Sequence, residues 1–562
     1  MSLQLKGAGG APGIAIGRAF CFQAEPAPGM HAQIGERPDA AMERFTAAQA
    51  AAAARLNALA EQQRADGFEQ EAGIFEFQAL LVEDPALTGE VARLVREEGQ
   101  PLDAALSAAV ALVRASIAGI DDAYLRERAA DVDAVGKEIR KALYGAGPSL
   151  AAVPAGAIVV APDLTPAETA ELRGGVAGFA TAYGGATGHT AILARAMGIP
   201  AVVGLGADAL AIADGTELIL DGSESLLIAE PTPEQRAAYA QRASAESTLS
   251  QQRRLAFRDQ AGRLADGHAV GVWANIGRPD EARAALDNGA EGVGLFRSEF
   301  LFLDRTAAPS EDEQFAAYRA ALEIMAGRPV VIRTLDIGGD KPVPYIDMPR
   351  EANPFLGVRG LRLCMRRPDL FATQLRALLR AAAHGDLWIM LPMVATLDDL
   401  RWGRAQLHAA ADALAAEGVA HRADACLGIM IETPAAAVTA DLLAREAAFF
   451  SIGSNDLTQY AMAADRGQAD LATRYPHDSP AVLRLIAQAA EAAKRAGIPL
   501  GVCGELAGVP EAAVLLAGLG VNELSMAPAA IPIVKERLRQ VSFEQAGEMA
   551  REAMQLLIRS NV

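Results

Sequence analysis

Residues 427–434 read LGIMIETP, and residues 448–456 read AFFSIGSND. Each stretch is a short apolar run that ends abruptly in polar residues, which is typical of a buried strand followed by a functional loop. Glu432 comes directly after the first run, and Asp456 closely follows the second. Repetition of this pattern predicts a parallel β-barrel that carries polar groups at the carboxyl ends of its strands.

Eight such apolar runs recur beyond residue 265, with helical patterns between them. About 300 residues with eight alternations favour a TIM (β/α)8 barrel over an open sheet. The predicted strands lie at 269–274, 292–296, 330–335, 387–392, 427–431, 448–452, 499–502 and 522–526.

The rest of the 562 residues divides into segments of different amino-acid composition. Residues 1–33 are rich in Gly and Pro and predict strands and turns, whereas residues 34–145 are rich in strong helix formers and predict a helical bundle. Residues 146–231 alternate short strands and helices. We therefore predict one α/β domain from 1–33 and 146–231, with the bundle inserted into it, a connecting helix at 232–263, and the barrel at 264–562.

Local signals support this division. Asp84 followed by Pro85 is a helix start, and apolar residues follow at helical spacing. These apolar residues are Leu87, Val91, Leu94 and Val95, and a second amphipathic run covers residues 121–143. In the α/β domain the predicted strands are 157–161, 176–181, 201–204 and 217–220, and the predicted helices are 168–173 and 190–197.

Composition excludes several classes of protein. The formal net charge is -19, which disfavours non-specific nucleic-acid binding because that binding neutralises phosphates with cations. The four cysteines are scattered without metal-site spacing, so we expect a reducing compartment and no disulfide framework. The amino terminus does not resemble a signal peptide, and no apolar run is long enough to span a membrane. We expect a cytoplasmic protein.

Five of the eight predicted strands are followed by polar residues that would meet on one rim of the barrel. A solvated loop or a structural ion pair is the alternative for any one of them alone, but convergence favours a site. The residues are Arg297-Ser298-Glu299, Arg333 with Asp336, Glu432, Asn455-Asp456 and Cys503-Gly504-Glu505.

The residue types indicate a chemistry. Glu432 and Asp456 offer oxygen ligands of the kind that Mg²⁺ takes, with substrate oxygens completing the shell. Arg297, Arg333 and Arg466 can bind phosphate oxygens in bidentate fashion. Two acids and three arginines together predict a small anionic substrate bound with a divalent ion.

Cys503 has two interpretations that the sequence leaves open. It is either a small buried hydrophobe or a thiol on the rim that gives a proton to a carbanionic or enolic carbon. Cys21, Cys364 and Cys426 have no comparable setting, and we interpret them as structural.

The stretch GGATGHT at residues 184–190 follows a predicted strand and opens a predicted helix. Such a turn presents unpaired backbone N–H groups and could hold a phosphoryl group, although it is not a P-loop. Its histidine, His189, could act as a nucleophile toward phosphorus. A helix-capping or hydrogen-bonded loop histidine is the alternative.

Taken together, these segments resemble the Enzyme I family of the bacterial phosphoenolpyruvate-dependent sugar phosphotransferase system. The resemblance runs through nearly the whole chain, and the order and spacing of its motifs make it specific. The matching motifs are APGIAIG (11–17), YLRERAADVDAVG (124–136), DLTPAET (163–169), GGATGHTAILAR (184–195), ANIG (274–277), GAEGVGLFRSEFLF (289–302), RTLDIGGDK (333–341), NPFLGVRG (353–360), IETPAA (431–436), SIGSNDLTQY (451–460), DRG (465–467) and CGELAG (503–508).

The resemblance implies a phosphotransferase that moves the phosphoryl group of phosphoenolpyruvate to His189 and then to the phosphocarrier protein HPr. HPr would bind the helical insertion, and the barrel would bind phosphoenolpyruvate and Mg²⁺ and form a homodimer. The net acidity would attract a carrier with a basic face. Glu432 and Asp456 would ligate Mg²⁺, Cys503 would protonate the enolate, and the residues that bind phosphoenolpyruvate would be Arg297, Arg333, Asn455 and Arg466.

The chain departs from the family pattern at Ala186 and Gly188, where the family often has Arg and Ser, and at Ser298, where Thr is usual. A pyruvate phosphate dikinase or phosphoenolpyruvate synthase would need a large nucleotide-binding domain, for which we see no room before the helical insertion. A relative serving nitrogen regulation commonly carries an additional amino-terminal sensory domain. A non-catalytic phosphocarrier or scaffold is disfavoured because Glu432, Asp456 and Cys503 are all present.

Overall fold

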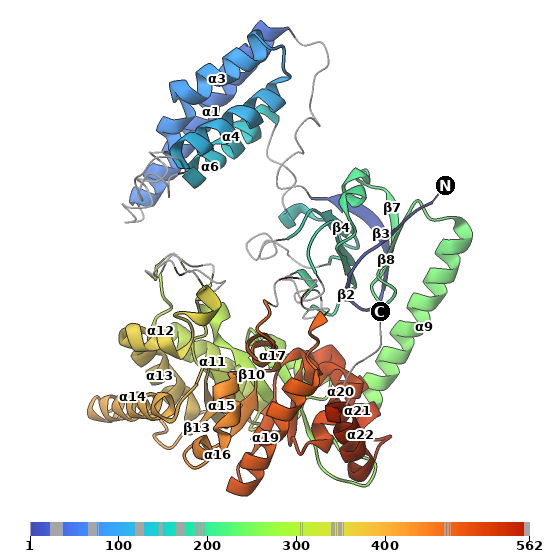
Figure 1. Ribbon diagram of the computed structural model, residues 1–562, viewed down its shortest axis with the longest axis vertical. Helices are drawn as coiled ribbons and strands as arrows, with labels where there is room; N and C mark the ends of the chain where they lie inside the picture. Colours follow the sequence, from blue (N-terminus) through green and yellow to red (C-terminus); the bar gives the residue numbers. More distant parts are fainter. Residues whose placement is uncertain are drawn as a thin grey trace. The chain divides into compact units, whose positions relative to one another are not determined.

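The computed structural model divides into two compact units, residues 1–16, 184–204 and 219–562, and residues 17–183 and 205–218 (Figure 1). The described residues are 2–22, 37–65, 76, 78–118, 129–144, 150–164, 175–185, 190–191, 194, 197–303, 305, 307–338, 343, 345–346, 351, 353–465, 468, 471 and 474–555.

Eight parallel strands form the closed barrel that the sequence predicted, and each predicted apolar run overlaps one of them. The ring closes where the last strand pairs with the first, at Leu524 opposite Val272. The strands are β9 (Gly271–Ile276), β10 (Val293–Arg297), β11 (Val330–Arg333), β12 (Leu387–Leu391), β13 (Cys426–Ile431), β14 (Phe450–Ile452), β15 (Leu500–Val502) and β16 (Glu523–Met526).

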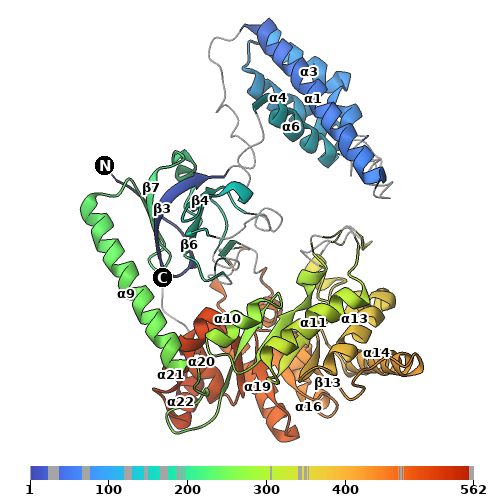
Figure 2. The same cartoon turned by 180° about the vertical axis from the view of Figure 1, so that it is seen from behind.

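Helices surround the strands of the barrel (Figures 1 and 2). Two of them begin with a capping box, Ser310 with Glu313 and Thr396 with Asp399, which satisfies amide groups at the helix start. The helices are α10 (Glu281–Asp287), α11 (Glu311–Met325), α12 (Leu361–Arg366), α13 (Pro368–Ala382), α14 (Leu397–Ala416), α15 (Pro434–Val438), α16 (Ala440–Leu443), α17 (Ser454–Met462), α19 (Pro480–Ala496), α20 (Pro510–Gly518), α21 (Ile531–Leu538) and α22 (Phe543–Gln555).

Alternate residues of the barrel strands serve two separate cores. Val330 and Ile332 belong to the large core between strands and helices, whereas Val331, between them, belongs to a small core inside the barrel. This alternation follows from the period of two in a strand. The interior core comprises Leu295, Val331, Met390, Met430, Phe449 and Cys503, with Trp273, Trp388 and Cys426 packed against it.

A second sheet has eight strands in the order β1-β8-β7-β3-β4-β5-β6-β2. Its first strand pairs antiparallel with its last, Leu3 opposite Ala229, and β3 pairs parallel with β4. The four predicted strands of residues 157–220 are confirmed, whereas the predicted helix at 168–173 lies outside the described residues. The strands are β1 (Leu3–Lys6), β2 (Gly9–Ala11), β3 (Ile14–Cys21), β4 (Ile158–Ala161), β5 (Gly178–Thr181), β6 (Ala201–Val203), β7 (Glu217–Asp221) and β8 (Leu226–Ala229).

A group of helices lies between β3 and β4 in the sequence, as predicted, and has its own apolar core around Phe45. In α3 the side chain of Asp84 accepts a hydrogen bond from the amide of Ala86 at 2.7 Å, so the predicted N-cap is confirmed. The four apolar residues predicted for this helix are its buried residues. The helices are α1 (Pro38–Ala65), α3 (Pro85–Arg96), α4 (Leu102–Ala118) and α6 (Ala129–Tyr144).

The predicted connecting helix is α9 (Pro233–Phe257), which ends before the predicted residue 263. The chain leaves the helix because the next residues make other contacts, among them the Gly262 amide, which donates to Glu291 at 2.8 Å. α9 buries none of its residues and is tied to α21 by an ion pair between Arg253 and Glu536 at 2.8 Å. Among the described residues, no helix combines the length and apolar character needed to cross a membrane.

Candidate active site

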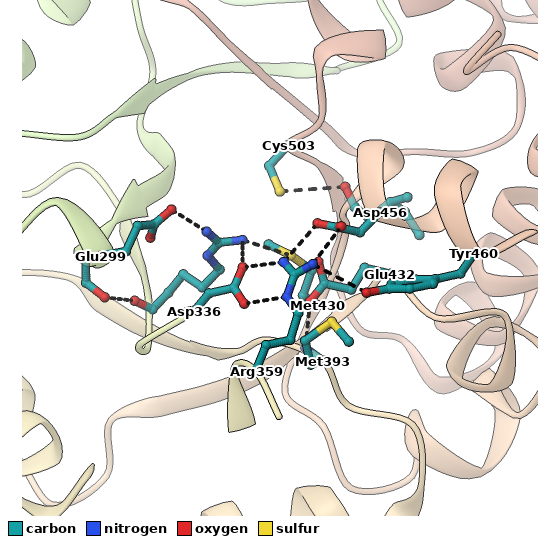
Figure 3. Close-up of polar contacts among 12 residues, drawn as sticks. Glu299, Asp336, Arg359, Met393, Met430, Glu432, Asp456, Tyr460 and Cys503 are labelled. Carbon is teal, nitrogen blue, oxygen red and sulfur yellow. Dashed lines mark hydrogen bonds and ion pairs between the residues drawn. The ribbon is translucent and has the colours of Figure 1, made fainter. Parts of the chain in front are cut away.

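The carboxyl ends of the barrel strands bring charged side chains from four segments together, as predicted (Figure 3). Glu299 follows β10, Arg333 ends β11, Glu432 follows β13, and Asp456 lies in the first turn of α17, after β14. Each strand is fixed by the ladder of its neighbours, so the side chains at its end have defined positions.

Arg333 is a buried cation held by two carboxylates. Its Nη2 donates to Oε1 of Glu299 at 2.6 Å, and its Nη1 lies 3.0 Å from Oδ2 of Asp336. Burial acts to lower the pKa of the guanidinium, but the nearby carboxylates of Glu299, Asp336 and Glu432 outweigh it and raise the pKa. Arg333 therefore stays charged at every physiological pH.

Arg359 is a second buried cation on the rim, and no role was predicted for it. Its Nη2 lies 3.0 Å from Oδ2 of Asp336, its Nη1 lies 3.1 Å from Oδ1 of Asp456, and Nη1 also donates to the Tyr460 hydroxyl at 3.4 Å. Figure 3 shows its guanidinium between these two carboxylates. Burial opposes its charge, but Asp336 and Asp456 raise its pKa beyond the usual value.

A glycine in the motif RTLDIGGDK allows Arg359 to reach this place. Gly338 has φ 121°, and a β-carbon there would meet Val358 O and the Arg359 side chain. The backbone of the two segments is joined where the Gly360 amide donates to Ile337 O at 3.1 Å. A larger residue at position 338 would push the arginine away from Asp336.

Glu432 is fully buried, and only one of its two carboxylate oxygens has a hydrogen-bond partner among the described residues. Its Oε1 accepts a hydrogen bond from the amide of Met393 at 2.6 Å, and Met393 adopts a left-handed φ of 56° to offer that amide. Its Oε2 is buried and has no hydrogen-bond partner among the described residues. Burial, with the negative charges of Asp456 and Asp336, raises the pKa of Glu432 to about 8.

The start of α17 is locked against the segment after β15. Gly504 packs directly on Ser454, where a β-carbon would overlap the serine hydroxyl. The next amide, that of Glu505, donates to Oδ1 of Asn455 at 3.2 Å. Asn455 and Asp456 are thereby held on the rim.

Cys503 directly follows β15, is only 2% exposed, and packs in the interior core of the barrel. Its Sγ donates to Ile452 O at 3.6 Å (Figure 3). Burial raises the pKa of the Cys503 thiol to about 12, although a hydrogen bond to Ser451 works in the opposite direction. The side chain is therefore a neutral thiol that carries its proton at physiological pH.

Arg297 ends β10 beside Arg333, to which it is paired in register. Within the described part of the chain its guanidinium has no ion pair, so it is available to an anion. The adjacent Ser298 donates to Arg333 O at 2.6 Å and accepts from Gln374 at 3.1 Å. Serine thus joins the ends of β10 and β11 with the same hydroxyl that threonine would supply.

Two predicted residues, His189 and Arg466, lie outside the described residues, as do Ala186 and Gly188. Cys21, Cys364 and Cys426 are free thiols, and their structural role stays a prediction.

Glu432 and Asp456 are the residues that could hold a metal ion. No group of three or more His, Cys, Asp or Glu side chains suited to a metal occurs in the described part of the chain. The orphaned, buried Oε2 of Glu432 nevertheless fits a cation, because a hard ion would supply the missing partner. Mg²⁺ commonly takes only one or two carboxylates and completes its shell with water and substrate phosphate.

Sequence reasoning assigned no role to Arg359 or Tyr460. Both lie inside quoted motifs, NPFLGVRG and SIGSNDLTQY, but neither directly follows a strand. The flanking Gly357 and Gly360 were a usable signal, because glycines beside an arginine mark a close backbone approach. Glu299 and Asp336 were placed on the rim by their strands, although no partner was predicted for either.

Comparison with known proteins gives consistent results along the chain. Three family models match it: "PEP-utilising enzyme, N-terminal" at residues 6–128, "PEP-utilising enzyme, mobile domain" at 153–225, and "PEP-utilising enzyme, PEP-binding domain" at 251–543.

Similar curated proteins span almost the whole length of the chain. The phosphoenolpyruvate-protein phosphotransferase of Bacillus sp. (strain S) is 42% identical over 557 residues, which cover 98% of this chain and 96% of that protein. The same figures hold for the protein of that name from Geobacillus stearothermophilus. The one from Priestia megaterium is 40% identical over 546 residues, covering 96% of this chain and 95% of its own.

Proposed function

The chain belongs to the phosphoenolpyruvate-protein phosphotransferase family, and on that premise we propose that it transfers the phosphoryl group of phosphoenolpyruvate to His189 and then to HPr. The observation that carries the proposal is the rim of the barrel. Arg333 and Arg359 are buried there with their charge, Arg297 is available, and Glu432 has an orphaned oxygen. An acidic chain that gathers buried cations at one place is suited to a small, highly anionic substrate.

We assign the substrate contacts to the residues of this rim. Arg297, Arg333, Asn455 and Arg466 bind phosphoenolpyruvate, and Glu432 and Asp456 hold Mg²⁺. When bound, the ion supplies charge neutralisation at the phosphoryl oxygens. Arg359 contributes a further positive charge beside Asp456, at 3.1 Å, and limits how far that carboxylate can move.

The reaction proceeds by in-line displacement on phosphorus. Arginines orient the phosphoryl group and neutralise its charge, which supplies most of the rate enhancement in this class of reaction. The imidazole of His189 attacks phosphorus, and the enolate of pyruvate leaves. Cys503 then donates its proton to the enolate carbon, a role suited to a thiol that burial keeps protonated.

The partners and location follow from the same premise. HPr binds the helical insertion, residues 34–145, which has an apolar core of its own. The barrel, residues 264–562, forms the homodimer, and the exposed Val438 and Leu442 on its helices support this. The α/β domain comprises residues 1–33 and 146–231. The free thiols of all four cysteines suit the cytoplasm.

Phosphoryl transfer from radioactive phosphoenolpyruvate tests the proposal. We expect label on the protein, and on added HPr, with Mg²⁺ but not with a chelator. His189→Ala should abolish both signals, and His477→Ala, which changes a barrel histidine bonded to Thr458, should leave them intact. Labelling of the His189→Ala protein would overturn the assignment of the phosphorylated residue.

A further inference from the structure

Glu523, the first residue of β16, places a carboxyl group inside the barrel. A β-carbon on Gly501 of β15 would meet its Oε2, and a β-carbon on Gly294 of β10 would meet its Oε1. The carboxyl therefore occupies space that exists because β15, next to β16, and β10, one strand further round the barrel, have glycine at these positions. No role in the proposed reaction has been given to it so far.

Burial of this carboxyl group lowers the stability of the fold. Its Oε1 is buried and has no hydrogen-bond partner among the described residues. A buried polar group left without a hydrogen-bond partner destabilises a folded protein. Burial raises the pKa of Glu523 to about 8, and the group is largely protonated at neutral pH.

Glu523 and Cys503 lie on the same interior face of the barrel. Cys503 comes two residues after Gly501, and Gly501 is paired in register with Glu523, so both side chains project inward. The charge of an ionised Glu523 acts on the Cys503 thiol and raises its pKa. The two groups therefore interact through the barrel interior.

A hydroxyl group lies between the two levels. Ser525 comes two residues after Glu523, and its Oγ lies 2.6 Å from the position of a β-carbon on Gly294, where Oε1 of Glu523 also comes close. The same Oγ donates to Oδ1 of Asn275 at 2.6 Å, and the amide nitrogen of Asn275 donates to Cys503 O at 2.9 Å. These contacts hold Ser525 and Asn275 between Glu523 and the backbone of Cys503.

We propose that Glu523 returns to Cys503 the proton that the thiol gives to the enolate, and so acts through Cys503 without touching the substrate. The inference rests on the proposed function, in which Cys503 is the proton donor. It adds a supply route from the amino end of the barrel, where Glu523 is partly exposed.

The proton balance closes at each step. The S–H bond of Cys503 breaks as a C–H bond forms at the enolate carbon, which gives pyruvate and a thiolate. The thiolate takes the proton of the Glu523 carboxyl, which lies on the same interior face of the barrel, beside the residue two positions before Cys503. Glu523 then takes a proton from water at the amino end. A separate route is needed because Cys503 is 2% exposed.

A solvent-jump experiment on the full-length protein tests the relay. Enzyme equilibrated in H₂O is mixed with phosphoenolpyruvate and Mg²⁺ in D₂O, the reaction is quenched after one turnover, and deuterium in the pyruvate methyl group is measured. In the wild type, exchange through Glu523 should give close to one deuterium per molecule. Glu523→Gln keeps the shape of the side chain but has no acidic proton. The pyruvate that it forms should therefore carry the protium that Cys503 held before mixing.

Steady-state rates give a second readout. We expect Glu523→Gln to lower kcat by about 10- to 100-fold, at or below the range for a group in direct proton transfer, with KM unchanged. Glu523→Asp retains an acid and should recover part of kcat. Glu417→Gln, which removes an exposed carboxyl from the end of α14, is the matched control and should behave as wild type.

The pH dependence separates a relay from a packing role. The wild-type kcat should fall as pH rises through the pKa of Glu523, and Glu523→Gln should lack that limb. The strands around the group contribute Asn275 of β9, Gly294 of β10 and Gly501 of β15, which do not titrate. Among the described residues, the titratable groups of the interior core are Cys503 and Cys426 of β13, and the charges of Arg333 and Glu432 on the rim act on Cys503.

The outcomes distinguish the relay from the proposed function. If Cys503→Ala makes pyruvate at the wild-type rate, the role of Cys503 as proton donor is wrong. If Cys503→Ala is impaired but Glu523→Gln matches the wild type in deuterium content, kcat and pH profile, the relay alone is overturned. Loss of kcat in Glu523→Asp equal to that in Glu523→Gln, with full deuterium incorporation in both, also refutes it.

Discussion

Arg359→Met should destabilise the barrel, because Arg359 neutralises two carboxylates that have little access to water. Asp336 is 2% exposed and Asp456 is 5% exposed, and the guanidinium lies 3.0 Å from the first and 3.1 Å from the second. Methionine fills much of the volume of arginine without its charge. The perturbation therefore removes the cation and leaves both acids in place.

The expected size follows from the remaining partners. Removal of one member of a buried ion pair costs about 3–5 kcal/mol, because the other charge is left without compensation. Asp336 keeps Arg333 at 3.0 Å, so its share of the loss is reduced. We therefore expect the free energy of unfolding of the barrel to fall by about 3 kcal/mol, the lower end of that range.

Intrinsic fluorescence can measure this for the barrel alone within the full chain. The protein has three tryptophans, and all of them, Trp273, Trp388 and Trp402, belong to the barrel or its helices. Urea unfolding followed by tryptophan emission gives the free energies for Arg359→Met, for Asp456→Asn and for the double variant. Because the residues are in contact, the double variant should lose less than the sum, with a coupling of about 1–3 kcal/mol.

The result that would refute this reasoning is a loss below about 1 kcal/mol for Arg359→Met, or additive losses in the double variant. Either would mean that the arginine does not compensate the buried charges. Arg401→Met, which removes an exposed arginine that contacts Glu446 at 2.7 Å, is the matched control and should leave the free energy of unfolding close to that of the wild type.

Three further outcomes are expected. Asp84→Ala should weaken the start of α3 by about 1 kcal/mol and speed hydrogen exchange of its first amides about fivefold, and unchanged exchange would contradict the cap. Cys503, with a thiol pKa of about 12, should react with iodoacetamide at pH 8 about 1,000-fold more slowly in the folded than in the urea-unfolded protein, and equal rates would be inconsistent with its burial. Glu523 binds its proton more tightly in the folded state, so barrel stability should fall as pH rises from the ordinary glutamate pKa of 4.5 to about 8. The slope should be up to about 1 kcal/mol per pH unit after allowance for partial exposure, and Glu523→Gln should remove it; identical slopes would disprove the shift.

The barrel strands could be predicted because each is a buried apolar run with a clear end. The run at 427–431 falls within β13, and the polar Glu432 follows it directly, so both the strand and its functional residue were visible in the sequence. The buried face of α3 was equally clear from the spacing of its apolar residues. Where burial and local period coincide, sequence alone is sufficient.

The positions of the Arg359 and Glu523 side chains could not be predicted from local patterns, for physical reasons. Arg359 lies in the segment between β11 and α12, and its place depends on tertiary packing at Gly338. Glu523 opens an apolar strand, and only the closed barrel places glycines opposite it. Helix α9 ends at Phe257 because of distant contacts that its helix-forming residues do not reveal.

The split origin of the eight-stranded sheet constrains how the chain can fold as it is made. Strand β3 pairs Ala19 with Ile158, and β1 pairs Leu3 with Ala229, so the first strands wait for partners that are synthesised far later. At about 5–20 residues per second, that delay is on the order of 10–40 s. The helical insertion, whose contacts are local, can fold while residues 3–21 remain without partners. An early chaperone binding to those strands, or a pause in translation between residues 144 and 226, would therefore affect this sheet and spare the helices.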